Sequence, residues 1–374
     1  MIYLDSAATS LIKPPCVERA VIQALRTMAS PGRGGHKPAE RAAETVYKCR
    51  ETAARLFTMH DPANVVFTMN ATHALNIAIF SLVRPGMKVL ISGFEHNSVT
   101  RPLRAAGADI VTVGRKLFDS KNVIDEFSKH IRECGLVVCT HVSNVFGFIL
   151  PVYEIAELCR RHSVPFILDA SQSAGTLNIN MEKLRASFIA MPGHKGLFGP
   201  QGTGLLLCGN DGKALIHGGS GSDSIMQNMP DYLPDRLEAG THNVCGISGL
   251  LAGMEYVEEK GTAEIFDHER MLLDAFSTML KDLDGVHLFT ADRKLQSGVI
   301  SLFSEIINSE ELAAKLSEKG ICVRAGLHCA PTAHESVGTL ERGTVRFSFS
   351  PFLSINQIER AAESVRMIIK EKIK

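Results

Sequence analysis

The sequence has no excess charge of one sign. Its 374 residues include 40 lysines and arginines and 40 aspartates and glutamates, without a long run of like charge. A patch that binds nucleic acid, or a polybasic segment that binds anionic lipid, needs such an excess. We therefore expect no nucleic-acid partner and no membrane partner, but small molecules or other proteins.

Long apolar runs are also missing. No stretch approaches the roughly 20 apolar residues that a helix needs to cross a bilayer. The first residues, MIYLDSAATS, lack the basic and apolar segments of a secretory signal. The sequence predicts a cytoplasmic protein.

Paired cysteines are absent, although the chain has nine cysteines. None of them has CxxC spacing, which argues against a disulfide framework and against a structural zinc site. We predict no metal site. Most of the cysteines are expected to be buried as small apolar side chains.

The chain does contain a series of short apolar runs, separated by helix-length segments. The runs are VVFTM (65–69), KVLIS (88–92), DIVTV (109–113), LVVCTHV (136–142), PFILDA (165–170), FIAM (188–191) and GLLLC (204–208). Strands that are apolar throughout indicate a mostly parallel sheet that helices cover on both faces. We expect an α/β fold, with a large domain over residues 16–246.

The pattern changes near Gly246. A long helical stretch follows, and then short strands alternate irregularly with helices up to the end of the chain. This mixture predicts a smaller α+β domain over residues 247–374, completed by residues 1–15.

Polar residues follow several strands, at the edge where open parallel sheets bind ligands. Ala71 and Thr72 begin a helix after the first run, and the free amides of a helix start can bind a phosphate. His96 follows the second run, Asn144 follows the fourth and Asp169 ends the fifth. Taken singly, the helix start is more often a plain cap and His96 is more often a surface or capping residue, whereas Asp169 is equally compatible with a helix cap and with a functional carboxylate.

Lys195 lies in an irregular loop, MPGHKGLFGPQGTG (191–204), which is rich in glycine and proline. By itself it would be an ordinary surface lysine. Pyridoxal phosphate, however, needs a lysine for covalent attachment, an anionic partner for its ring nitrogen and a phosphate site. Lys195, Asp169 and the helix start supply this set, and His96 could stack on the ring. Gly193 and Gly196 are expected to leave room for a planar cofactor.

Seven motifs resemble, in this order, those of the class V aminotransferase family and of its cysteine desulfurase and selenocysteine lyase branch. They are NATHALN, EHNS, HVSNVFG, DASQ, GHKGLFGPQGTG, LEAGTHN and RAGLHCA. The resemblance covers nearly the whole chain. It implies a pyridoxal-phosphate enzyme of fold type I that forms a homodimer, with active sites near the subunit interface. It further implies L-cysteine or L-selenocysteine as substrate, a protein that accepts the sulfur, and a role in sulfur metabolism such as iron-sulfur cluster assembly.

The resemblance also assigns roles to single positions. It implies that Lys195 binds the cofactor covalently and acts as the general base, and that Thr241 reaches the phosphate of the other subunit's cofactor. Arg346 corresponds to the arginine that clamps the substrate carboxylate, for which a bidentate guanidinium is well suited. The implied cofactor contacts are Ala71, Thr72, His96, Asp169, Gln172, His194, Lys195 and Thr241. The implied substrate contacts are His36, Asn144 and Arg346.

Cys329 decides between the branches of the family. In RAGLHCA it follows a glycine turn, so we expect its thiol to be exposed at a loop tip over the cleft. The resemblance implies that Cys329 takes the substrate's sulfur as a persulfide, and that Lys195, His96 and Cys329 are the catalytic residues. An aminotransferase or another carbon-sulfur lyase would not need Cys329, which would then be a free surface thiol.

Two positions depart from the family pattern. Pro192 stands two residues before His194, where many relatives have serine or threonine, so one hydroxyl expected at the phosphate is missing. Leu327 precedes His328, where other members have a second histidine. The loop around Cys329 is therefore more apolar than in those members.

Overall fold

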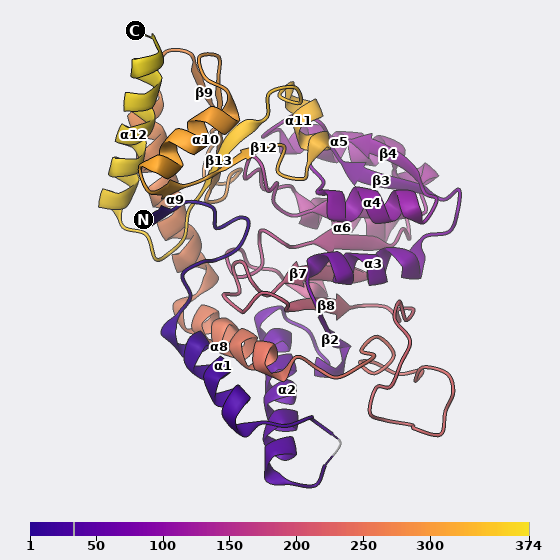
Figure 1. Ribbon diagram of the computed structural model, residues 1–374. Coiled ribbons are helices and arrows are strands. Elements are labelled where there is room, and N and C mark those ends of the chain that lie inside the picture. Colours follow the sequence, from indigo (N-terminus) through magenta and orange to yellow (C-terminus); the bar gives the residue numbers. More distant parts are fainter. Residues whose placement is uncertain (33, 374) are drawn as a thin grey trace.

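The computed structural model describes residues 1–32 and 34–373 (Figure 1). Within these residues, the larger sheet has seven strands, all of which coincide with the predicted apolar runs. In spatial order they are β2 (Val65–Thr68), β8 (Gly204–Cys208), β7 (Phe188–Pro192), β6 (Phe166–Asp169), β5 (Leu136–Thr140), β3 (Lys88–Ser92) and β4 (Asp109–Val113). Only β8 runs against its neighbours in this part of the chain. The predicted α/β fold with a mostly parallel sheet is confirmed.

Helices cover both faces of the larger sheet. Those on one face are α3 (Ala71–Leu82) and α4 (Asn97–Ala105), and those on the other are α2 (Lys37–Leu56), α5 (Ser120–His130), α6 (Val152–Arg161) and the short α7 (Met181–Leu184). Within β3, Val89 and Ile91 pack under α3 and α4, whereas Leu90 packs on the opposite side. Both faces of the strand are buried, and this explains why its sequence is apolar without alternation.

A second sheet is antiparallel and has its own core. Its described strands, in spatial order, are β12 (Arg324–Gly326), β13 (Thr344–Ser348), β10 (Val299–Ser304) and β9 (Val286–Leu288). The helices α9 (Thr262–Leu280), α10 (Ser309–Glu318) and α12 (Ile355–Ile373) contribute to this core. The chain start joins the same part of the molecule, because β1 (Ile2–Tyr3) pairs with β11 (Ile321–Cys322).

Two long helices lie side by side in the lower part of Figure 1. They are α1 (Pro15–Thr27) and α8 (Val244–Lys260), and α8 also packs on α2. Its side chains Leu250 and Met254 belong to the core of the larger sheet. The predicted boundary near Gly246 thus falls in the first turn of a helix that packs with the preceding residues. The division into two domains stays a prediction, and residue 374 lies outside the described residues.

The strand ends position the polar residues named above. The carboxyl ends of β6 and β7 carry Asp169 and, three residues beyond Pro192, Lys195. Arg346 lies on β13 of the second sheet, and α11 (Pro331–Val337) follows the loop that contains Cys329.

No helix among the described residues has the length and apolar character that crossing a membrane requires.

Candidate active site

A cavity of about 200 Å³ lies at the carboxyl ends of the parallel strands, where residues of the second sheet also line its wall. Nine predicted site residues line this cavity: Ala71, Thr72, His96, Asn144, Asp169, Gln172, His194, Lys195 and Arg346. They come from segments that are far apart in the sequence. Tertiary structure alone brings them together.

Asp169 is buried at the end of β6 and keeps one carboxylate oxygen available. Its Oδ1 accepts hydrogen bonds from the Ser171 amide and hydroxyl, whereas Oδ2 accepts none from the described residues. Burial raises the pKa of Asp169, and the two bonds from Ser171 oppose this rise. The open oxygen suits a protonated ring nitrogen, which would also compensate the buried charge.

Lys195 lines the same cavity, and its Nζ has no hydrogen-bond partner among the described residues. Burial lowers its pKa to about 8; the Asp169 carboxylate opposes this change, and Arg346 and Arg324 add to it. Close to neutral pH, Lys195 therefore has a far larger fraction of neutral amine than an exposed lysine. A neutral amine is the form that reacts with an aldehyde and accepts a proton.

Glycine is required beside Lys195 for a different reason from the one expected from the sequence. A Cβ on Gly193 would lie 2.2 Å from Thr203 Oγ1, and a Cβ on Gly196 would lie 2.4 Å from the Ala174 carbonyl oxygen. Both positions need glycine because the protein packs tightly against itself there. The loop fixes Lys195 through these contacts.

The start of α3 provides a site for an anion. Asn70 caps the helix by accepting a hydrogen bond of 2.9 Å from the His73 amide, and the amides of Ala71 and Thr72 have no partner among the described residues. Thr72 Oγ1 lies 2.8 Å from Ser98 Oγ. Two open amides and two hydroxyls at the positive end of a helix suit a phosphate group.

Two histidines of the site are neutral near pH 7. Burial, together with the charge of Lys195, lowers the pKa of His96 to about 4. Burial and Lys195 also lower the pKa of His194 to about 4. His96 caps α4, because its Nδ1 accepts a hydrogen bond of 3.0 Å from the Ser98 amide. A neutral, fixed imidazole can stack on a cationic ring without charge repulsion.

Gln172 and Arg346 both contact the chain start. Gln172 Nε2 donates a hydrogen bond of 3.0 Å to the Ala7 carbonyl oxygen, which leaves its second N–H available. Arg346 is buried, and its Nη2 donates to Asp5 Oδ1 at 2.6 Å while Nη1 donates to the Asn144 carbonyl oxygen at 3.0 Å. The clamp expected for a substrate carboxylate thus already has a carboxylate partner.

Cys329 lies beside the cavity rather than in its wall. It is the only exposed cysteine of the nine, all of which are among the described residues. Its neighbour His328 lines the cavity, and Asn144 Nδ2 donates to the His328 carbonyl oxygen at 2.8 Å. Both His328 and Cys329 have positive φ angles, of 51° and 57°, which non-glycine residues rarely adopt. The loop therefore turns sharply and presents the thiol to solvent, as its sequence predicted.

Two further predicted residues, unlike Cys329, have no neighbour that links them to this cavity in the contacts described above. Thr241 is exposed before α8 and lines a different pocket, together with Met69 and His73. His36 is exposed at the start of α2 and does not line the active-site cavity. Within one chain, neither residue joins the others. The role of Thr241 in a partner subunit's site, and that of His36 near the substrate, stay predictions.

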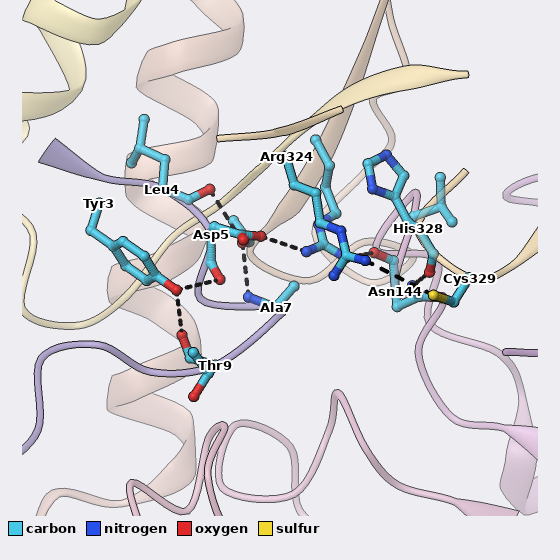
Figure 2. A network of polar contacts seen from close by, with 12 residues as sticks. Tyr3, Leu4, Asp5, Ala7, Thr9, Asn144, Arg324, His328 and Cys329 are labelled. Carbon is cyan, nitrogen blue, oxygen red and sulfur yellow. Dashed lines mark hydrogen bonds and ion pairs between the residues drawn. The ribbon is translucent and has the colours of Figure 1, made fainter. Parts of the chain in front are cut away.

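Sequence reasoning missed two charged residues of the site. Arg324 lines the cavity, and its Nη2 lies 3.9 Å from Cys329 Sγ (Figure 2). It belongs to the motif RAGLHCA, which could have indicated it. Asp5 had no comparable signal, because its partner Arg346 lies 341 positions away in the sequence.

Comparison with known proteins identifies the family of this chain. The profile of the family described as "Aminotransferase class-V" matches residues 2–361. The chain belongs to the class V aminotransferases. Members of this family depend on pyridoxal phosphate, and the open oxygen of Asp169, the unpaired Lys195 and the helix start of α3 fit that cofactor.

Several relatives of this class V aminotransferase have names that state a specific activity. A "Probable cysteine desulfurase" of Pyrococcus abyssi is 30% identical, over 99% of this chain and 94% of that protein. A protein with the same name from Methanothermobacter thermautotrophicus is also 30% identical, over 98% of this chain and 94% of its own length. The solved apo structure of a cysteine desulfurase from Thermococcus onnurineus NA1 has a TM-score of 0.90, with 29% identity over 99% of this chain and 95% of that chain.

Proposed function

We propose that this class V aminotransferase is a pyridoxal-phosphate-dependent cysteine desulfurase. It converts L-cysteine to L-alanine and keeps the sulfur as a persulfide on Cys329. The observation that carries this proposal is the position of the one exposed cysteine, at the rim of a cavity that contains Lys195 and Asp169. The names of the relatives support it.

The residues of the cavity would hold the cofactor as follows. Lys195 would bind it covalently, Asp169 would pair with its ring nitrogen, and the α3 start with Thr72 and His194 would bind its phosphate. His96 would stack on the ring, and the free N–H of Gln172 would face its phenolic oxygen. When bound, the cofactor supplies an electron sink for the substrate's Cα.

The chain's own residues would then move protons and sulfur. Arg346, assisted by Asn144, orients the substrate by its carboxylate, and Lys195 Nζ takes the proton from Cα. The thiolate of Cys329 attacks the substrate's sulfur; the bond from this sulfur to Cβ breaks, and a persulfide remains on Cys329. Nη2 of Arg324 lies 3.9 Å from the Sγ atom that makes this attack.

The partners proposed here are a second copy of the chain and a protein that accepts the sulfur. Thr241 is exposed and lies away from its own chain's cavity, which suits a residue that completes a neighbouring site. Cys329 is open to an acceptor thiol at the surface. Cytoplasmic sulfur metabolism, such as iron-sulfur cluster assembly, is the proposed setting.

The test is to supply the purified protein with L-cysteine and a reductant and to measure alanine and sulfide. A cysteine desulfurase releases both in equal amounts. A parallel assay with L-selenocysteine measures the preference between sulfur and selenium. Pyruvate with ammonia in place of alanine would indicate a simple carbon-sulfur lyase, and transfer of the amino group to a keto acid would indicate an aminotransferase.

The pKa of Lys195 predicts how covalent cofactor binding depends on pH. Only the neutral amine reacts with the aldehyde, so below pH 8 the rate should fall about tenfold per pH unit. Above pH 8 the rate should level off, whereas an exposed lysine would react faster up to a pH near 10.5, its ordinary pKa. Stopped-flow absorbance after mixing the apoprotein with pyridoxal phosphate measures this rate. A rise that continues to pH 10 would contradict the lowered pKa.

Replacement of Asp169 by alanine should reduce turnover more than cofactor retention. Without the carboxylate the ring nitrogen loses its counter-charge, and we expect kcat to fall roughly 100-fold in protein saturated with cofactor. Asp169→Asn keeps the shape and removes the charge, so it should behave like Asp169→Ala. The measurements are kcat and bound cofactor per chain. Turnover close to that of the wild type in both variants would remove Asp169 from the mechanism.

A further inference from the structure

The first residues of the chain form a strap across the site. We call residues 2–10 the N-terminal strap, which is hydrogen-bonded to the second sheet through the Ser348 amide and to the Lys195 loop through the His194 carbonyl oxygen. At one end the Leu4 amide donates to the Cys322 carbonyl oxygen at 2.8 Å, and at the other the Ser10 amide donates to the His194 carbonyl oxygen at 2.9 Å. In between, the strap accepts the hydrogen bond from Gln172.

The strap holds Asp5 in one place. The Tyr3 hydroxyl lies 3.1 Å from the Asp5 carbonyl oxygen and 2.9 Å from that of Thr9, and these two acceptors share its single hydrogen (Figure 2). The Ala7 amide donates to Ser348 Oγ at 2.8 Å, and Ser348 is two residues from Arg346 on β13. Asp5 is therefore tied to the strand that carries its guanidinium partner.

The contact between Asp5 and Arg346 occupies much of the guanidinium. The two side chains are 19% and 2% exposed, so water screens their 2.6 Å ion pair only weakly. Nη1 donates to the Asn144 carbonyl oxygen, and the buried Nε has no hydrogen-bond partner within the described part of the chain. A substrate carboxylate that enters the cavity must share Nη1 and Nη2 with these two acceptors, or displace one of them.

The charges around the cavity also affect how strongly Arg346 attracts a substrate carboxylate. Among the described residues, its wall contains the cations Lys195, Arg324 and Arg346 and the acidic residue Asp169, and Asp5, which does not line the cavity, forms an ion pair with Arg346. Without Asp5, the guanidinium would be buried and unpaired whenever substrate is absent, which is unfavourable. With Asp5, part of its attraction for another carboxylate is lost.

We propose that Asp5 competes with the substrate's carboxylate for Arg346, so that the N-terminal strap sets how tightly carboxylate ligands bind. This inference rests on the proposed role of Arg346 as the substrate clamp. The same competition favours release of alanine, which has the same carboxylate as cysteine. Asn144 links the site of this exchange to the loop of the proposed nucleophile, because it contacts Arg346 through its carbonyl oxygen and donates through Nδ2 to His328, the residue before Cys329.

The experiment measures binding of propionate, a small carboxylate, to purified full-length protein by calorimetry. Asp5→Asn keeps a hydrogen-bond acceptor for Arg346 and removes the charge, so propionate should bind about tenfold more tightly than to the wild type. Propionamide, the neutral analogue, should bind equally to both proteins. The KM for L-cysteine should fall in parallel with the dissociation constant of propionate.

Tyr3→Phe is the matched control for a purely structural effect. It removes the hydroxyl that fixes the strap but retains the Asp5 carboxylate, so it should not tighten propionate binding. If Asp5→Asn does not fold, Asp5→Ser provides the same comparison. The proposal is overturned if the folded variant binds propionate no more tightly than the wild type, or if neither protein binds it. Failure of the wild type to desulfurate cysteine, with tighter propionate binding in Asp5→Asn, would reject only the proposed function.

Discussion

Replacement of Cys329 by serine is expected to reduce sulfur transfer from L-cysteine by roughly 1,000-fold or more, because a hydroxyl cannot hold sulfur as a persulfide. The side chain is exposed and nearly isosteric with serine, so folding and cofactor binding should be unaffected. The measurements are sulfide and alanine release, thermal stability and the cofactor's absorbance. Selenocysteine can lose its selenium with less help, so residual activity on it would indicate the lyase.

Mass spectrometry of the wild type after incubation with cysteine gives a second, independent readout. One added sulfur atom should be found on the peptide that contains Cys329. Cys322→Ser is the matched control, because Cys322 is a partly buried cysteine on the neighbouring strand β11 and should not be needed for transfer. Added sulfur on Cys322, or undiminished desulfuration by Cys329→Ser, would disprove the assignment of the nucleophile and favour an aminotransferase or a simple lyase.

Lys195→Ala is expected to abolish turnover and the covalent bond between protein and cofactor. Among the residues that the structure describes, no other lysine lines the cavity, so none of their amines is placed to replace it. Some cofactor should still bind noncovalently through the α3 start and Asp169. Borohydride reduction followed by peptide mapping measures the covalent bond, and alanine release measures turnover.

The control for this variant is Lys213→Ala, which removes an exposed lysine outside the cavity. It should retain wild-type turnover and the full reducible adduct. Lys195→Arg adds a second comparison, since it keeps a positive charge but cannot react with an aldehyde at neutral pH. A reducible adduct that survives in Lys195→Ala would assign the covalent bond to another lysine.

The sequence predicted the larger sheet well because each strand is buried on both faces. Val89, Leu90 and Ile91 point alternately to the two helical layers, yet all must be apolar, so the strand is visible as an uninterrupted run. The boundary near Gly246 was harder to place. It depends on the partner against which α8 packs, and the helical pattern of α8 does not contain this information.

For the candidate site, too, the sequence predicted some features and not others. Residues of the cofactor site follow strand ends and helix starts, where the local pattern already indicates ligand binding. Gly193 and Gly196 show the limit of such reasoning. They were expected to leave room for a cofactor, but Thr203 and Ala174 occupy the space that their side chains would fill. The sequence reveals that a side chain is missing, but not which neighbour requires its absence.

The sequence by itself determined the fold class, the family and the chemical identity of the residues in the cavity, because apolar runs and short motifs are local and survive without coordinates. Only the tertiary structure decided which of these residues meet. It separated His36 and Thr241 from the nine predicted residues that line the cavity of one chain, and it paired Arg346 with Asp5. The physical reason is that burial, pKa and ion pairing depend on groups that converge in space from distant parts of the chain.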